Sequence, residues 1–208
     1  MPPRVFLSFN CDRDAARALH VAGPRGLFET CEWRGLLSRS GWTALERRGR
    51  AAVQHWIDAE LSSSSVAVIL IGGETCASPW VHYAIQRSRA EGKGMIGVRV
   101  HRLADPRTGL CDYRGLNPFE INYVTGSVPP VFLNALYPTY DWVADAGERN
   151  FRGWIDAAAS RAVSSAAPGS RPTAERQPER SRPLSSCAFA SSRHVSDDWS
   201  PAAWRAEP

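Results

Sequence analysis

The chain has 208 residues, of which 43% are hydrophobic and 22% charged, as is ordinary for a globular protein. Its formal net charge of +4 is spread along the chain, which argues against the dense basic stripe of a nucleic-acid-binding surface. No stretch reaches the roughly 20 apolar residues of a membrane span, and the apolar run at the N-terminus is too short for a secretory signal. We therefore expect a cytoplasmic protein with no nucleic-acid and no membrane partner.

Cysteine and histidine are scattered along the chain. The five cysteines show no CxxC spacing, and the five histidines form no paired ligand motif. Disulfide frameworks and metal sites both depend on such spacings. The sequence thus predicts reduced thiols, no metal site and no bound cofactor.

The first part of the chain predicts a strand followed by a helix. Apolar residues alternate over Arg4–Phe9, as they do in a strand. The polar residues Asn10–Asp14 that follow suit a loop and a helix cap. We expect a short helix over Ala15–Val21, and then an irregular connection over Gly23–Gly41 with a short strand near Leu27–Thr30.

The most apolar stretch of the chain forms the centre of the predicted fold. A helix with a regular apolar stripe is predicted over Ala44–Leu61. The run Val66–Ile71 is rich in Val and Ile and ends at Gly72 and Gly73, which predicts a strand buried on both faces. Proline tolerates the first turn of a helix, so we expect a helix over Pro79–Arg89.

The same pattern continues downstream. Met95–Val100 predicts another strand, His101–Tyr123 a surface loop, Val131–Tyr140 a strand or short helix, and Asp141–Val163 a closing helix. Strands that alternate with helices at this spacing predict a parallel α/β sheet with right-handed crossovers. Ser, Ala, Pro and Arg dominate from residue 164 onward. We therefore expect one folded domain over residues 1–163 and a disordered tail over 164–208.

Several short motifs, taken in their order, resemble one family. They are FLSF at the end of the first strand, SSVAVILIG with the following PWVHYAI, GKGMIGV, the tripeptide NPF, and YDWVADAGERNFRGWI. Together they resemble the TIR-like domain family, and within it the TIR proteins of Thoeris antiphage defence, over nearly all of residues 4–156. The resemblance implies a flavodoxin-like fold, with a parallel sheet and helices on both of its faces.

That fold implies a position for a ligand. The first and third strands are neighbours in a flavodoxin-like sheet, and ligands bind where their carboxyl ends meet. The crevice would lie between Phe9, Asn10 and Asp12 on one side and Gly72 and Gly73 on the other. Glycine amides can approach a phosphate closely. Asn10 and Asp12 would serve equally well as plain helix caps.

One helix would form the wall of this crevice. Trp80 and Tyr83 are three residues apart and share a helix face. They would stack on an adenine or nicotinamide ring. Burial of both rings against the sheet is the competing interpretation.

The resemblance also implies a reaction and its partners. Enzymes of the TIR superfamily cleave the bond between nicotinamide and ribose in NAD, and some cyclise the product into a nucleotide signal. NAD would be the substrate, a phage-derived protein the trigger, and an effector the receiver of a diffusible signal. Self-association into a homo-oligomer is a further expectation. The chemistry needs a carboxylate near the ribose to stabilise an oxocarbenium-like centre.

That carboxylate is missing from this chain. The family places a Glu in a W-V-x-Y-E-I motif, and the motif here is WVHYAI, with Ala84 at the Glu position. Three interpretations stay open: a naturally non-catalytic module that binds a nucleotide or a partner, an engineered inactive variant, or an enzyme that uses another carboxylate. Glu74 and Asp12 are the candidate surrogates. His82 points away from position 84 on a helix, which predicts a surface histidine.

Overall fold

The structure is a computed structural model that describes residues 3–23, 32–35, 38–124 and 126–165. The chain divides into two units, residues 1–166 and 167–208, and all described residues belong to the first. The short strand predicted near Leu27–Thr30 lies outside the described residues, as does the predicted tail from residue 166 onward.

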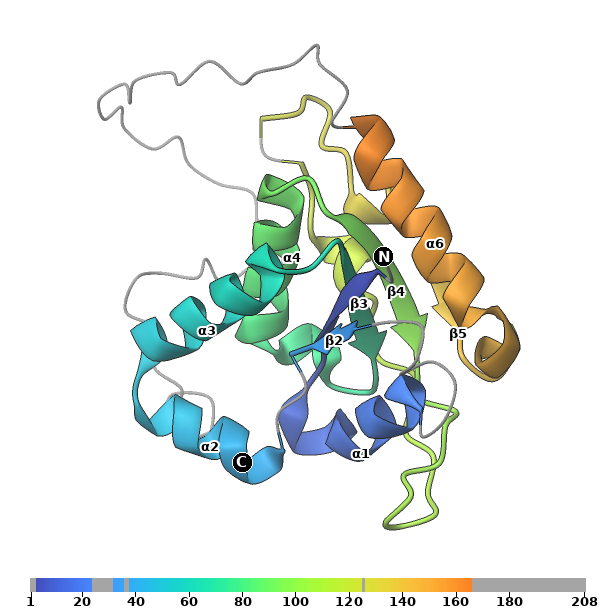
Figure 1. The fold of residues 1–208 in the computed structure, drawn as a ribbon. Coiled ribbons are helices and arrows are strands. Elements are labelled where there is room, and N and C mark those ends of the chain that lie inside the picture. Colours follow the sequence, from blue (N-terminus) through green and yellow to red (C-terminus); the bar gives the residue numbers. More distant parts are fainter. Residues whose placement is uncertain (1–2, 24–31, 36–37, 125, 166–208) are drawn as a thin grey trace, which may run out of the picture. The chain divides into compact units, whose positions relative to one another are not determined.

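Five parallel strands form one sheet (Figure 1). They are β1 (Arg4–Ser8), β2 (Glu32–Arg34), β3 (Val66–Ile71), β4 (Gly94–Arg99) and β5 (Thr139–Asp141). Their order is β2-β1-β3-β4-β5, so β3 lies at the centre between β1 and β4. This is the flavodoxin-like strand order. The predicted fold class and the predicted contact between the first and third strands are confirmed.

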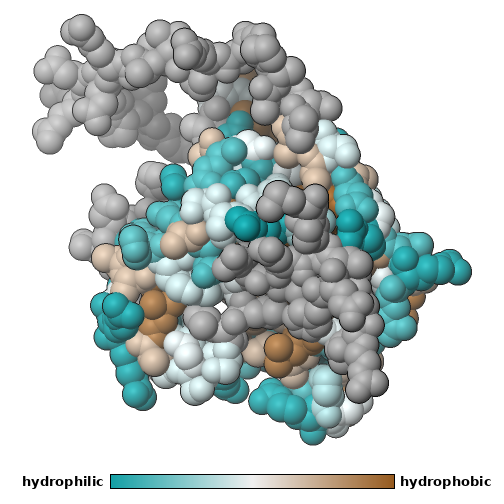
Figure 2. Space-filling view, viewed as in Figure 1, coloured by the Kyte–Doolittle hydropathy of each residue, from teal (hydrophilic) through white to brown (hydrophobic). Residues whose placement is uncertain are grey.

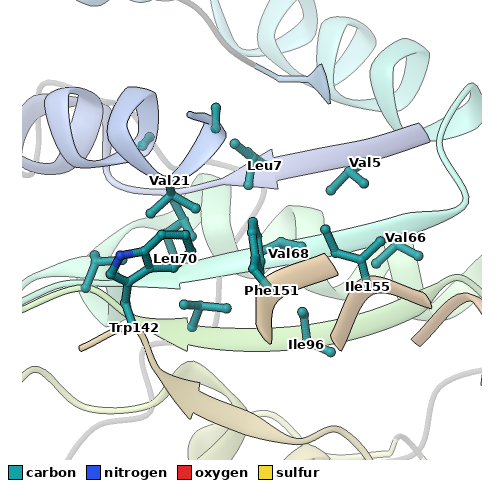
Figure 3. Packing of buried hydrophobic residues seen from close by; sticks show 14 of the residues in the cluster. Val5, Leu7, Val21, Val66, Val68, Leu70, Ile96, Trp142, Phe151 and Ile155 are labelled. Carbon is teal, nitrogen blue, oxygen red and sulfur yellow. The ribbon is translucent and has the colours of Figure 1, made fainter. Parts of the chain in front are cut away.

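Helices cover both faces of this sheet. On one face, α1 (Cys11–Ala22) and α6 (Gly147–Ser165) pack against the strands, with Val21 drawn beside Leu70 and Phe151 beside Val68 in the same core cluster (Figure 3). On the other face, α3 (Arg50–Ser62) and α4 (Pro79–Ala90) pack against each other, and α4 also contacts β3 and β4. The molecule is therefore built in three layers.

The alternation of side chains in β3 explains why its sequence is apolar throughout. Val66, Val68 and Leu70 belong to the core cluster that α1 and α6 cover. Ala67, Ile69 and Ile71 point to the opposite face, since successive side chains of a strand alternate. All six are buried, and each fully buried Val, Leu or Ile contributes about 1.5–3 kcal/mol relative to exposure. Figure 2 shows hydrophobic residues on the viewed face as small patches between hydrophilic ones, which is normal for a folded surface.

The helix predicted over Ala44–Leu61 is wrong, because two helices occupy this region. α2 (Arg39–Arg47) is separated from α3 by Arg48 and Gly49. Gly49 has a φ of 94°, a left-handed conformation that favours glycine and ends a right-handed helix. α2 also begins earlier than predicted, because the Ser38 hydroxyl accepts a hydrogen bond from the Gly41 amide at 3.1 Å.

Two other helix starts differ from the prediction for reasons of capping and pairing. α1 begins at Cys11, because Asn10 Oδ1 accepts the Asp12 amide at 3.1 Å and caps the helix. α6 begins only at Gly147, because β5 extends to Asp141 and the Asp141 carboxylate then accepts the Val143 amide at 3.0 Å in a turn.

The remaining connections hold short elements. The predicted surface loop after β4 contains α5 (Pro118–Ile121), and the segment predicted as strand or short helix contains the 3₁₀ turn η2 (Leu133–Ala135) before β5. Another 3₁₀ turn, η1 (Thr75–Ala77), connects β3 to α4. Within the described ranges, no helix combines the length and the apolar character that crossing a membrane requires.

Candidate functional site

An aromatic cavity lies at the carboxyl end of β1, where three helices each supply a tryptophan. Trp42 of α2 meets Trp56 of α3 and Trp80 of α4 edge to face, with ring centroids 6.0 and 6.5 Å apart. Aromatic pairs favour this geometry. The other lining residues come from β1, the segments after β1 and β2, and the helices α1, α3 and α4: Phe6, Leu7, Ser8, Phe9, Cys11, Gly35, Ile57 and Val81.

The aromatic cavity is small. Its volume is about 30 Å³, enough for a water molecule or two and far below the space that a nucleobase needs. Trp80 is buried, whereas Trp42 and Trp56 are half-buried. A flat ring can therefore enter only if the two half-buried tryptophans move apart.

A larger cavity, the arginine cavity, shares Cys11 with the aromatic cavity. Its volume is about 270 Å³. Arg39, at the start of α2, and Arg107, in the loop after β4, line it together with Ser38 and Asp12. Guanidinium groups are suited to bind phosphate oxygens two at a time. In this structure Arg39 instead lies 3.4 Å from the Asp12 carboxylate, and both side chains are exposed.

Cys11 joins the two cavities but is chemically inert. Burial raises the pKa of its thiol to about 11, and the neighbouring Asp12 carboxylate acts in the same direction. The thiolate, which is the nucleophilic form, is thus scarce at neutral pH. Cys11 serves as a packing residue between the cavities.

The glycine turn after β3 is covered by the loop that follows β4. Gly72 and Gly73, the predicted phosphate cradle, are both buried. A Cβ added to Gly73 would lie 2.8 Å from the Tyr113 ring, and Gly115 packs against the backbone of both glycines. The Gly72 amide donates to Thr75 Oγ1 at 2.8 Å. The structure therefore brings Phe9 and Trp80 together at a cavity and separates the two glycines from it.

Three buried charged side chains and one buried hydroxyl hold this loop in place and form what we call the polar lock: Asp14, Arg17, Asp112 and Thr75. Arg17 Nη1 lies 3.0 Å from Asp14 Oδ1 and 3.8 Å from Asp112 Oδ2. The Arg17 Nε donates to the Leu103 carbonyl at 2.8 Å, so the guanidinium also binds the loop backbone. The polar lock thus ties α1 and the β3 turn to the loop after β4.

The two carboxyl groups of the polar lock differ in their electrostatics. Burial raises the pKa of Asp14, and the hydrogen bond from Arg17 offsets this only in part. Burial also acts to raise the pKa of Asp112, but hydrogen bonds from the Tyr113 amide and from Arg13 outweigh it and hold that pKa below its usual value. Asp112 is therefore the firmly ionised carboxylate of the polar lock.

Ala84 is buried on the face of α4 that packs against the rest of the domain. Its exposed fraction is 1%, and it follows Trp80 by one helical turn on the same face. The Ser88 hydroxyl donates to its carbonyl at 2.7 Å. Ala84 lines neither of the two cavities, and its methyl group supplies no charge to them.

The side chains flanking Ala84 are engaged in structural hydrogen bonds. The Tyr83 hydroxyl donates to both carboxylate oxygens of Asp58 at 3.0 Å, while its ring meets Trp80 edge to face at 6.4 Å. His82 is half-buried, with its ring nitrogens 2.7 Å from the Cys76 carbonyl and 2.8 Å from the Asn122 amide. The prediction of a surface histidine is wrong, because helix α4 presents this face to η1 and to the segment after α5.

The two candidate surrogate carboxylates are both exposed and both lie beside an arginine. Glu74 Oε1 is 2.7 Å from Arg13 Nη1, and Asp12 is the partner of Arg39 described above. Asp12 lines the arginine cavity, whereas Glu74 lines neither of the two cavities.

Sequence reasoning missed three contributors to the site. Trp42 lies in a stretch where the sequence shows no clear start of a helix, and Trp56 lies inside the single helix that the sequence predicts over Ala44–Leu61. Asp112 lies in a predicted surface loop, 99 residues from its partner Arg13. The signal available for Trp42 was Ser38, because serine is a preferred helix N-cap and a helix that begins there contains Trp42.

The fold and the site together define a TIR-like α/β domain. Residues 6–105, which run from β1 into the loop after β4, match the family described as Thoeris protein ThsB, TIR-like domain. This stretch of the chain is similar to that family. A curated protein of Bacillus cereus (strain MSX-D12), named "Putative cyclic ADP-D-ribose synthase ThsB1", is 24% identical over 157 residues, an alignment that covers 59% of this chain and 82% of that protein.

Proposed function

We propose that this chain acts in bacterial antiphage defence as a ThsB-like protein that responds to infection by converting NAD into a cyclic ADP-ribose-type signal for a separate effector. The observation that carries the proposal is the pair of cavities that meet at Cys11. One is lined by tryptophan rings and the other by two arginines. A dinucleotide carries both an aromatic base and phosphate groups, so it matches this pairing.

The name of the Bacillus cereus relative, a cyclic ADP-D-ribose synthase, supports NAD as the substrate of this chain. The aromatic cavity would take the nicotinamide end and the arginine cavity the diphosphate. Binding would require Trp42 and Trp56 to move, and would replace the exposed contact between Arg39 and Asp12 by contacts to phosphate. Exposed ion pairs of this kind contribute only about 0–1 kcal/mol, so this replacement costs little.

A second candidate is a non-catalytic TIR module that binds a nucleotide or a partner. The observation that favours it is Ala84, which leaves α4 without a carboxylate one turn after Trp80. Oxocarbenium-like transition states depend on electrostatic stabilisation, and a single lost group of this type costs roughly 100- to 1,000-fold in rate. Of the surrogates, only Asp12 lines one of the cavities.

The deciding experiment compares NAD consumption and cyclic product formation by the purified full chain and by Ala84→Glu. Each is assayed with and without lysate from phage-infected cells. Ala84 lines neither cavity in this structure, so the proposal requires that a glutamate side chain at this position reach the ribose of the bound NAD. If it does, turnover of Ala84→Glu should exceed that of the unchanged chain by about 100-fold or more. Ala84→Gln is the matched control, because it adds the same bulk without the charge and should stay at the low rate.

The other outcomes separate the candidates. Turnover by the unchanged chain that is lost in Asp12→Asn or Glu74→Gln would assign the reaction to that surrogate carboxylate. If no variant turns over NAD, although circular dichroism shows each to be folded and infected lysate is present, the enzyme proposal fails and the binding module is favoured.

A further inference from the structure

The hydroxyl of Ser8 is a polar group at the aromatic cavity that the fold does not use. Ser8 is the last residue of β1, lines this cavity and is only 6% exposed. Its side chain forms no hydrogen bond within the parts of the chain that the structure describes. Buried polar groups are almost always hydrogen-bonded in proteins. An exception at the wall of a cavity indicates a place for a ligand.

The alternation of side chains along β1 turns Ser8 toward the aromatic cavity. Val5 and Leu7 belong to the core cluster that α1 and α6 cover (Figure 3). Successive side chains of a strand point to opposite faces, so Ser8 points to the face that α3 and α4 cover. The aromatic cavity lies on that face, because Trp56 of α3 and Trp80 of α4 line it.

The rest of the cavity wall is aromatic or apolar and carries no charge. Among the described residues that line it, there is no Asp, Glu, Lys, Arg or His. Trp42 meets the other two tryptophan rings edge to face. A ligand that fits such a wall is a flat ring with one polar substituent, placed within reach of a single hydroxyl.

The two aromatic ends of NAD differ in how well they fit this wall. Nicotinamide carries one carboxamide, whose oxygen can accept a hydrogen bond from a serine hydroxyl. Adenine carries donors and acceptors around its edge, and most of them would stay unpaired in an apolar cavity, which disfavours burial. The single hydroxyl of Ser8 therefore matches nicotinamide better than adenine.

We propose that Ser8 binds the carboxamide of the nicotinamide ring and makes the aromatic cavity specific for the amide form of the dinucleotide. The inference rests on the proposed function, because it takes NAD as the ligand, and it names the group that selects the ring. A nicotinic acid ring has nearly the same shape but carries a carboxylate. Burial of a carboxylate without a cationic partner is strongly disfavoured, so the cavity should reject the acid form.

A binding role for Ser8 also predicts how the unliganded chain responds to its removal. A serine that supports the fold loses a hydrogen bond when it is replaced by alanine, and the melting temperature falls. Ser8 has no such bond to lose among the described residues, so Ser8→Ala should melt at the same temperature as the unchanged chain or a few degrees higher. Ser64 is 5% exposed, and its hydroxyl donates to the Glu60 carbonyl at 2.7 Å. Ser64→Ala should therefore melt at a lower temperature.

The test is the affinity of the full chain for three ligands, measured by isothermal titration calorimetry: NAD, nicotinic acid adenine dinucleotide and ADP-ribose. The first two differ only in the carboxamide, and ADP-ribose lacks the ring. We expect the unchanged chain to bind NAD about 100-fold more tightly than the acid form. Ser8→Ala should raise the Kd of NAD about tenfold or more and leave that of ADP-ribose unchanged. Chromatography after each titration verifies that the NAD is intact.

Ser64→Ala is the matched control and should bind all three ligands as the unchanged chain does, since Ser64 lines neither of the two cavities. If Ser8→Ala binds NAD as tightly as the unchanged chain, the inference is overturned while the proposed function stands. Equal weakening of NAD and ADP-ribose also overturns it, because Ser8 would then support the shape of the site without contacting the ring. Equal binding of NAD and the acid form excludes selection of the amide. If the unchanged chain binds none of the three ligands, the proposed function fails together with the inference.

Discussion

The polar lock and the aromatic cavity cover the carboxyl ends of the parallel strands in two different ways. In the polar lock, each side-chain nitrogen of Arg17 donates to a carboxylate or a carbonyl. In the aromatic cavity, the Trp42 ring meets two other tryptophan rings edge to face and a small space remains. Directional bonds fix the lock in one arrangement, whereas aromatic edges can slide at lower cost. We therefore expect the polar lock to keep one arrangement, whereas the tryptophan rings of the aromatic cavity can rearrange.

The largest expected effect comes from breaking the polar lock. Arg17→Met leaves the buried Asp14 without its cationic partner, and breaking a buried ion pair costs about 3–5 kcal/mol of unfolding free energy. Arg39→Met is the matched control, because the side chains of Arg39 and its partner Asp12 are 58% and 62% exposed and exposed ion pairs contribute about 0–1 kcal/mol. Urea unfolding of both variants measures the difference. Equal losses would mean that the lock is no stronger than a surface ion pair.

The aromatic cavity should respond differently to truncation. Trp42→Ala removes two edge-to-face contacts, each of which contributes about 0.5–1.5 kcal/mol beyond simple burial. We expect a loss of about 1–3 kcal/mol and an enlarged apolar cavity, since such cavities persist and bind small aromatic molecules. Indole should therefore raise the melting temperature of Trp42→Ala and leave that of Arg17→Met unchanged. An equal response of both variants to indole would remove the contrast between the two regions.

Two glycines allow a sharper comparison of similar size. Gly73→Ala pushes a methyl group against the Tyr113 ring, and overpacking of this kind costs about 1–3 kcal/mol. Gly153→Ala, within α6, meets nothing within 4 Å and should stabilise the protein by up to about 1 kcal/mol, because alanine favours helices. Thermal unfolding measures both the expected loss of stability in Gly73→Ala and the expected gain in Gly153→Ala. A stable Gly73→Ala would show that the loop after β4 moves away from the glycine turn at little cost.

The smallest effect is a pH dependence from His101, which follows β4 and lies near the covered turn. Burial lowers its pKa below 6.5, against a smaller opposing effect of Asp141, and Nδ1 has no hydrogen-bond partner among the described residues. The unfolded chain thus binds a proton at a higher pH than the folded chain does. Stability should decrease as the pH falls from about 6.5 through the lowered pKa, and level off below it.

The measurement is the unfolding free energy between pH 7 and pH 5. His101→Gln should flatten the dependence on pH, whereas His55→Gln, whose side chain is exposed, should leave it unchanged. A dependence that persists in His101→Gln would have to come from another group.

The parts of the fold that the sequence predicted well depend on local pattern. Val66–Ile71 is apolar at every position, so its place at the centre of the sheet followed from the residues themselves. The sequence did not predict that Gly49 separates two helices, because a glycine within a helical pattern of apolar residues is compatible with one continuous helix until its φ is known. The strand β2 (Glu32–Arg34) lies in a connection with no hydrophobic periodicity, and the short strand predicted near Leu27–Thr30 falls outside the described residues.

The candidate site was harder to predict, because its residues meet only in three dimensions. The sequence indicated Phe9 and Trp80 from the end of a strand and the start of a helix, and the structure brings both to one cavity. The glycine turn looked open in the sequence, but Tyr113, forty residues downstream, covers it. The roles of Gly72, Gly73 and Tyr83 in binding a ligand stay predictions.

The central strand β3 also affects how readily this protein aggregates. VAVILI has no charge and no proline, and such six-residue runs stack into cross-β aggregates when they are exposed. In the fold, β3 has a neighbour on each side, and the sheet ends at β2 and β5 with only three residues each. Edge strands this short offer few backbone groups to another chain. Substitutions that open the sheet should therefore lower the yield of dispersed protein more steeply than they lower the folded fraction.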